Sequence, residues 1–171
     1  MLNRPSKEEY NAYYERYVQL VPEGNIYDIL TQSLKNTTDF FSNVGEDRAH
    51  YRYAEGKWSM KEVLGHITDN ERIMCYRLLR IARGDTTPLA GYDQDVLISG
   101  SSFDKNPVAD LLEDYAAVRR ATLTLFRGLS DEAWSRRGCV NDSESSAKAW
   151  AYIIIGHEIH HMNVINERYL D

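Results

Sequence analysis

The sequence predicts an all-α fold, a four-helix bundle with a long crossover connection and an added N-terminal helix. Apolar residues recur every three to four positions in several long stretches, which is the period of an amphipathic helix. No convincing run alternates apolar and polar residues as a half-buried strand would. The four prolines, at positions 5, 22, 88 and 107, lie near expected helix boundaries. Since no linker or repeat divides its 171 residues, we expect one domain over residues 1–171.

The first expected helix covers the tyrosine-rich N-terminus. Ser6 and Glu9 have the spacing of a capping box, in which a serine and a glutamate satisfy the free backbone groups of a helix start. The helix should end before Pro22, and residues 1–22 are assigned to it as an addition to the bundle. It carries Tyr10, Tyr13, Tyr14 and Tyr17. Such a helix could support a homodimer or simply cover the bundle, and the sequence leaves both open.

Four long helices are expected after it. Ser59 and Glu62 form a second capping box, and Gly45 and Gly84 are suited to helix ends because glycine tolerates left-handed geometry. Proline suits the first position of the helix that opens at Pro107. The long helices are predicted over about residues 25–44, 59–83, 107–129 and 145–170, with a short helical turn at 130–134. The connections over 45–58 and 84–106 are long, which predicts a crossover.

Composition and charge exclude several functional classes. A formal net charge of −6 argues against broad binding to a nucleic-acid backbone, which requires a basic surface. No apolar run approaches about 18 residues, so no transmembrane span is expected. The polar N-terminus lacks the apolar region of a signal peptide, and we therefore expect a cytoplasmic protein. Cys75 and Cys139 are then expected to be free thiols, with Cys75 packed in the core.

Two histidines four residues apart carry the strongest chemical signal. Each helical residue turns about 100°, so His161 lies at about +40° from His157. This face is otherwise apolar and holds Trp150, Ile153 and Val164. Both imidazoles should therefore point into the core, where an unpartnered polar group is costly. They could be ordinary buried histidines bonded to carbonyls or carboxylates, but the spacing also lets both reach one divalent ion, which favours a metal site.

The surrounding residues, His157-Glu158-Ile159-His160-His161, formally match the H-E-x-x-H pattern of zinc peptidases, whose glutamate is the general base. Two features argue against a peptidase. Only ten residues follow His161, too few for a separate helix with a third ligand, and no predicted strand would hold an extended peptide. We therefore expect the third ligand upstream.

His66 is the candidate for that ligand. It lies on the predicted helix over 59–83, at about −100° from Ile67, where the boundary of the apolar face can border a cleft. Glu71 lies among the apolar residues of the same helix, where a carboxylate needs a partner or a metal. His160 falls at the edge of the apolar face of its own helix. A surface position, or a contact with a ligand histidine, suits it better than ligation.

Two segments resemble the DinB-like superfamily of metal-binding helical bundles. Residues 56–72, GKWSMKEVLGHITDNER, resemble its first metal-binding helix, which begins with a GKWS-type motif and carries the first histidine. Residues 156–161, GHEIHH, look like its second motif, in which histidines four apart supply the other two ligands. Residues 129–134, LSDEAW, are similar to the connection between its last helices. The resemblance covers the chain from about residue 25 onward.

This resemblance implies a four-helix bundle with a long crossover and a divalent ion, zinc or nickel, held by His66, His157 and His161. Water would fill the remaining coordination positions. Members of the superfamily include S-transferases and isomerases that use low-molecular-weight thiols such as bacillithiol, and proteins described as metal-dependent hydrolases. We accordingly expect a small-molecule substrate, which could be such a thiol, and neither nucleic acid nor membrane as a partner.

Two functions from different classes follow. In the first, the protein is a metal-dependent transferase or hydrolase whose nucleophile is a metal-bound thiolate or water. Glu71 or Glu158 would then be a general base, or Glu71 would orient a histidine by a hydrogen bond. Glu158 could instead lie at the rim and pair with Arg72 or Arg168. In the second, the protein is a non-catalytic metal-binding stress-response protein. Open coordination positions favour the enzyme, because structural zinc sites are usually closed by four protein ligands.

Overall fold

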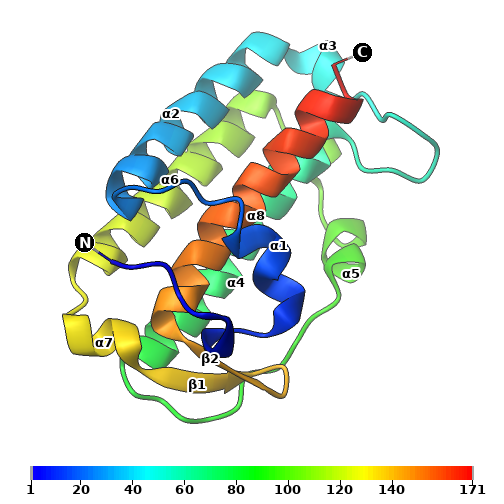
Figure 1. Ribbon diagram of the computed structural model, residues 1–171. Helices are drawn as coiled ribbons and strands as arrows, with labels where there is room; N and C mark the ends of the chain where they lie inside the picture. Colours follow the sequence, from blue (N-terminus) through cyan, green and yellow to red (C-terminus); the bar gives the residue numbers. More distant parts are fainter. Residues whose placement is uncertain (1, 171) are drawn as a thin grey trace.

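A computed structural model describes residues 2–170 (Figure 1). Its framework is four long helices, which confirms the predicted all-α bundle. They are α2 (Ile26–Val44), α4 (Met60–Ala82), α6 (Val108–Arg127) and α8 (Ala147–Arg168). Within this described part of the chain, no helix is both long and apolar enough to cross a membrane.

The four helices form a bundle in which helices that follow one another in sequence are not always neighbours. Helix α4 packs extensively against α6 and α8, and α6 also packs against α2 (Figure 1). Helices α2 and α4 make few contacts, as do α6 and α8, so both of these pairs lie across the bundle from each other. The connections from α2 to α4 and from α6 to α8 therefore both cross the bundle. As a result α4 and α8, which are distant in sequence, lie side by side.

Local signals fix the ends of these helices as expected. The Asn25 side chain accepts a hydrogen bond from the Tyr27 N–H, and Ser59 forms its capping box with Glu62. The Ser146 side chain accepts one from the Ala149 N–H at the start of α8. The φ angle of Gly45 is 77°, in the left-handed region that a side chain would make costly.

The N-terminal segment is not the continuous helix predicted from Ser6 to Pro22. It consists of two 3-10 turns, η1 (Lys7–Glu9) and η2 (Ala12–Tyr14), and one turn of α-helix, α1 (Glu15–Val18). The Glu9 carboxylate accepts from the Ser6 N–H, but Tyr10 is extended and Asn11 begins a new turn by accepting from the Tyr13 N–H. The capping residues at Asn11 therefore outweigh the helical spacing of the tyrosines.

Helix α1 lies on α8, and their backbones meet at Gly156 (Figure 1). A Cβ atom added to Gly156 would lie 2.0 Å from the Tyr17 carbonyl oxygen, so only glycine permits this approach. The segment thus covers the bundle, whereas the homodimer stays a prediction.

The connections hold short elements that the sequence did not predict. The first contains α3 (Glu46–Ala49), and the second contains α5 (Gln94–Ser99) and η3 (Phe103–Lys105). The short helix expected at 130–134 is present as α7 (Asp131–Ser135).

A β-hairpin between α7 and α8 is an exception to the predicted all-helical chain. Strands β1 (Arg137–Val140) and β2 (Ser143–Ser146) pair antiparallel, with Arg137 opposite Ser146. The two turn residues, Asn141 and Asp142, have φ angles of 50° and 58°, which a two-residue hairpin turn requires and these residue types tolerate. The turn residues therefore indicate a hairpin, although the strands are too short and too polar to show an alternation of apolar and polar residues.

Helix α8 runs through the interior. Every residue from 149 to 158 is buried, because α1, α4, α7 and β2 surround this half of the helix. The apolar face expected around Trp150 and Ile153 is therefore only part of a helical segment, residues 149–158, that is buried on all sides. Two apolar clusters flank the middle of the bundle, one around Trp150 and Phe126 and the other around Leu64 and Tyr115.

Candidate metal centre

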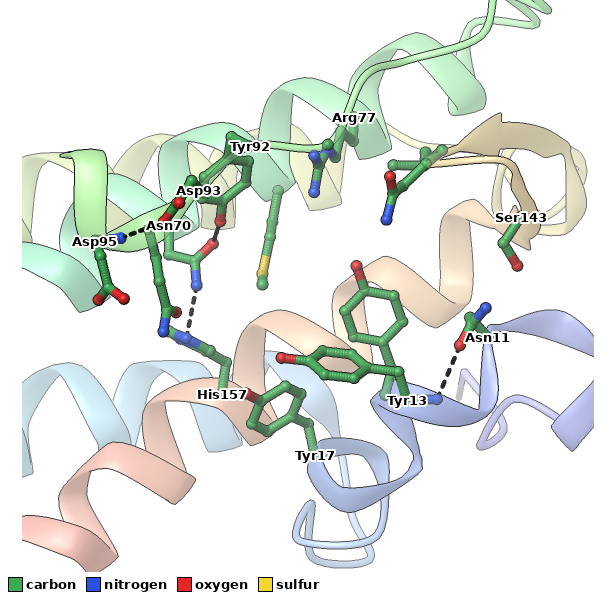
Figure 2. A pocket seen from close by; sticks show the side chains of 16 residues that line it. Asn11, Tyr13, Tyr17, Asn70, Arg77, Tyr92, Asp93, Asp95, Ser143 and His157 are labelled. Atoms are coloured by element: carbon green, nitrogen blue, oxygen red, sulfur yellow. Dashed lines mark hydrogen bonds between the residues drawn. The ribbon is translucent and has the colours of Figure 1, made fainter.

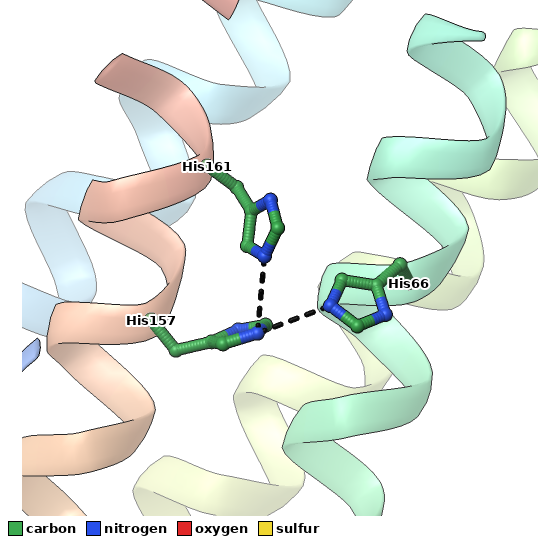
Figure 3. Close-up of side chains that lie close together, drawn as sticks. All are labelled: His66, His157 and His161. Atoms are coloured by element: carbon green, nitrogen blue, oxygen red, sulfur yellow. Dashed lines mark hydrogen bonds between the residues drawn. The ribbon is translucent and has the colours of Figure 1, made fainter. Parts of the chain in front are cut away.

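The three predicted histidines meet between α4 and α8 (Figure 3). The Nε2 atom of His157 lies 3.1 Å from Nε2 of His66 and 3.2 Å from Nε2 of His161. One ring nitrogen from each of the three lies within 4.8 Å of the others, as the ligands of a single ion would. The i,i+4 pair on α8 and the upstream residue on α4 are thus brought together as the sequence suggested.

Aromatic rings hold the three imidazoles in place. The Trp58 ring lies 4.7 Å from that of His66 and 6.4 Å from that of His161, nearly parallel to the latter. The Tyr17 ring contacts His157 edge-on at 5.4 Å. Trp58 comes just before the capping box that starts α4, and Tyr17 comes from α1. Trp58, just before α4, and Tyr17, on α1, therefore both restrict the rotamers of the histidines.

Burial keeps the cluster uncharged. The side chains of His66 and His157 are each only 4% exposed. Burial lowers the pKa of His66 to about 4 and that of His161 to about 2. The pKa of His157 lies well below its ordinary value because of burial and, to a lesser extent, its histidine neighbours. All three are therefore neutral at pH 7, which is the protonation state that binds a metal.

The hydrogen bonds around His157 fit an ion better than they fit a protein-only network. Its Nε2 is approached by both other histidines and by Nδ2 of Asn70 at 2.6 Å. A neutral ring nitrogen offers one lone pair or one proton, so it cannot satisfy three neighbours. Bonds of about 2.05 Å to a tetrahedral ion would separate two ligand nitrogens by about 3.3 Å, close to the observed 3.1 and 3.2 Å. The donor set therefore fits a divalent ion.

Tyr92 orients the Asn70 amide beside the cluster. Burial raises the pKa of Tyr92 to about 12, so the hydroxyl keeps its proton and donates it to Oδ1 of Asn70. The amide nitrogen is then left to face His157 (Figure 2). Asn70 lies one helical turn beyond His66, whereas Tyr92 comes from the loop before α5 and carried no signal in the sequence.

The two carboxylates proposed as bases belong to a separate buried network. Glu71 accepts from Nη2 of Arg119 at 2.7 Å and from the Thr122 hydroxyl at 2.6 Å. Glu158 accepts from Arg119 at 2.6 Å and from Thr37 at 2.7 Å, and further from Tyr115 and Ser33. Within residues 2–170, neither carboxylate is hydrogen-bonded to a histidine of the cluster.

This network corrects the expected surroundings of Glu158. It is 1% exposed rather than at the rim, and its partner is Arg119 rather than Arg72 or Arg168. Arg72 pairs instead with Asp69 and Asp114. Burial would raise the pKa of Glu158, but Arg119 and its hydrogen bonds outweigh burial and hold it below the ordinary value. A general-base role for Glu71 or Glu158 stays a prediction.

His160 and the cysteines complete the list of predicted residues. His160 is half-buried and packs its ring against Tyr17 at 5.4 Å and His161 at 5.1 Å, beside the cluster. Cys75 and Cys139 are both free thiols, as expected. Cys75 is only half-buried, with its sulfur 3.1 Å from the Thr122 hydroxyl oxygen, and burial raises its pKa to about 12.

A cavity of about 660 Å³ opens beside the histidines (Figure 2). His157 and Asn70 lie at one end of it, and tyrosines of the N-terminal segment line one side. Its other polar lining includes Arg77, Tyr92, Asn141 and Ser143. A volume of this size suits a small organic molecule. The N-terminal segment, the loop before α5 and the hairpin turn meet here only through tertiary structure, which is why the sequence did not reveal the cavity.

Comparisons with known proteins agree with this architecture. The sequence model of the DinB superfamily matches residues 29–165. The structure of YfiT from Bacillus subtilis, described as a probable metal-dependent hydrolase with an unusual four-helix bundle topology, superposes with a TM-score of 0.70 at 15% identity. That match covers 96% of this chain and 90% of YfiT. The DinB-like protein YjoA from the same organism matches with a TM-score of 0.60 at 16% identity, over 85% of this chain and 90% of its own. No curated protein matches the sequence.

Proposed function

Since the chain belongs to the DinB superfamily, we propose that it is a metal-dependent enzyme that acts on a small molecule. The divalent ion, zinc or nickel, would be held by His66, His157 and His161. One observation carries the proposal: His157 is at once a member of the histidine cluster and part of the cavity wall. An ion held there would face a space large enough for a substrate rather than be enclosed by protein.

The chemistry depends on what fills the remaining coordination positions. A divalent ion on three neutral imidazoles lowers the pKa of a bound water or thiol and so supplies a nucleophile near pH 7. Water would make the protein a hydrolase, and the likeness to YfiT supports that version. A low-molecular-weight thiol would make it an S-transferase, which the size of the cavity also permits.

The residues around the cluster have separable tasks in this proposal. Trp58 and Tyr17 exclude water from the outer sides of the imidazoles. The Asn70 amide, oriented by Tyr92, is a hydrogen-bond donor at the cavity end nearest the cluster. Glu71 and Glu158 tie α4 and α8 to Arg119, which keeps the histidines of the two helices within reach of one ion.

Metal analysis tests the site itself. Purified protein should bind about one zinc or nickel ion per chain, and His66→Ala should lose stoichiometric binding because two ligands remain. His50→Ala is the matched control, since His50 is half-exposed and lies outside the cluster. Full metal binding by His66→Ala would overturn the three-histidine site.

Turnover separates the enzyme from the non-catalytic alternative. The metal-loaded protein is assayed with monochlorobimane in the presence of several cellular thiols, and with an activated ester in the absence of thiol. Turnover of monochlorobimane with a thiol indicates an S-transferase, and turnover of the activated ester indicates a hydrolase. A protein that binds stoichiometric metal but turns over neither would be assigned to the metal-binding stress-response class.

A further inference from the structure

Arg77 is a buried cation to which the described part of the chain offers no anionic partner. Its side chain belongs to α4 and is 5% exposed. Nη2 donates to the Ala90 carbonyl oxygen at 2.8 Å, and the guanidinium lies near the rings of Tyr92 and Trp150. Among residues 2–170 no carboxylate forms an ion pair with it, whereas the buried Arg119 pairs with two. An arginine withdrawn from water normally has such a partner, because its desolvation is costly.

The guanidinium lines the same cavity as the histidine cluster (Figure 2). Arg77 follows Asn70 by seven residues, which is about two turns and about 10 Å along the helix and returns to nearly the same face. Its guanidinium lies beside the ring of Tyr92, whose hydroxyl is bonded to Asn70 at the cluster (Figure 2). The cavity therefore has the histidine cluster at one end and a cation on its wall about two helical turns farther along α4.

A guanidinium of this kind is suited to a carboxylate. It presents five N–H donors, and carboxylates accept two of them side by side, with geometry that an ammonium group cannot supply. Arg77 is the one arginine or lysine among the described residues that line the cavity, and Asp93 and Asp95 also line it. One guanidinium matches the charge of a single carboxylate, and the two aspartates in the same lining disfavour a dianion such as a phosphate monoester.

We propose that the substrate carries a carboxylate bound by Arg77, two helical turns along α4 from the end of the cavity where Asn70 and His157 lie. The substrate class is thus a small organic acid that is long enough to reach from Arg77 to the histidine cluster. Tyr13, Tyr14 and Tyr92 also line the cavity and supply rings to pack against the body of the molecule. The reacting end of the proposal rests on the proposed function, whereas the carboxylate site does not.

Arg77 also has a structural contact, so the test must separate the two roles. Its bond to the Ala90 carbonyl helps to hold the loop that carries Tyr92. A purely structural arginine would affect stability and all ligands alike. A carboxylate site distinguishes an acid from its neutral ester.

The probes are monohydroxamates of dicarboxylic acids of increasing length, each paired with the methyl ester of its free carboxylate. Binding is measured by ligand-observed NMR on metal-free protein and by calorimetry on zinc-loaded protein. Wild type is compared with Arg77→Gln, Arg77→Lys and the control Arg120→Gln, because Arg120 is exposed and lies on α6 outside the cavity. Thermal melts establish that each variant is folded.

The acid should bind wild type and Arg120→Gln about 10- to 100-fold more tightly than its ester. Arg77→Gln should lose this preference while binding the ester as wild type does, and Arg77→Lys should keep only part of it. Equal affinity of wild type for acid and ester, or an unchanged preference in Arg77→Gln, would overturn the proposal. If Arg77→Gln does not fold, an undiminished preference in Arg77→Lys overturns it. Failure of zinc to strengthen hydroxamate binding counts against the metal site alone, because the metal-free comparison does not depend on it.

Discussion

Replacing Arg119 with methionine should destabilise the bundle more than any change at its surface. Arg119 is 0% exposed and joins Glu71 on α4 to Glu158 on α8, with a further bond to Ser33 on α2. Methionine fills much of the same volume but leaves two carboxylates in the interior without their cation. Removing one partner of a buried ion pair typically costs about 3–5 kcal/mol. For a chain of this size the melting temperature should fall by about 6 to 20 °C.

The pH dependence of that loss identifies its cause. In the wild type the pKa of Glu158 lies below the ordinary 4.5, so it is ionised in the folded and unfolded states at higher pH. Its stabilising contribution is therefore constant from about pH 7 to about pH 5 and is lost as the pH falls through the folded pKa. In Arg119→Met the opposing charge is gone, and burial, the largest effect on Glu158, should raise its pKa above 4.5 despite the remaining hydrogen bonds from Tyr115 and Thr37. The folded variant then binds a proton that the unfolded chain does not, so its stability rises as the pH falls from about 7 to 5.

Urea denaturation at several pH values measures both effects, with Arg120→Met as the control on the exposed side of the same helix. The stability of Arg119→Met should recover partly on acidification, while wild type and control stay level over the same range. A variant as stable as the wild type near pH 7, or one whose stability falls in parallel with the wild type on acidification, would refute this account of the network.

Three further outcomes follow from individual contacts. Gly156→Ala should destabilise the fold by about 1–3 kcal/mol in urea titrations, because the added Cβ would meet the Tyr17 carbonyl. The control Gly128→Ala should be near neutral, since the nearest atom to its added Cβ lies at 3.5 Å. Equal effects of the two substitutions would contradict the close approach of α1. Asp142→Gly should be neutral or slightly stabilising, and Asp142→Val destabilising by about 1–2 kcal/mol, because φ is 58° there; a stable valine variant would argue against this turn. The Cys75 thiol, whose pKa is raised to about 12, should react with iodoacetamide near pH 8 far more slowly in the folded protein than in urea, as followed by mass spectrometry of its peptide.

The bundle was predictable because its signals are local. Capping residues such as Ser59 and the apolar period of each long helix act over a few positions, and they gave helix ends within one or two residues of those observed. The continuous N-terminal helix was wrong because the cap at Asn11 starts a new turn. The hairpin was missed because its strands are four residues long and its only strong signal lies in the turn, at Asn141 and Asp142.

The residues of the site likewise divide into those that local spacing predicts and those that depend on tertiary structure. The positions of His157 and His161 follow from their spacing on one helix, whereas the choice of His66 depended on the resemblance to a family more than on its helical phase. Arg119 could not be assigned to Glu158 because the pairing crosses the bundle between helices that scarcely touch elsewhere. Tyr92 gave no signal, since its proximity to the histidines depends on how the connection between α4 and α6 returns to the bundle. Arg77 lies on the same helix as His66, but its burial and its place in the cavity wall depend on tertiary structure.

The central position of α8 has a consequence for how the protein is made. The helix that fills the interior is the last of the four to leave the ribosome, and until residues 149–158 emerge the surfaces of α1 and α4 that pack against it are uncovered. Until then the nascent chain carries these surfaces without their partner, and such surfaces are exposed to aggregation and to chaperones. Folding of the bundle, and with it assembly of the histidine cluster, is therefore delayed until translation has passed α8.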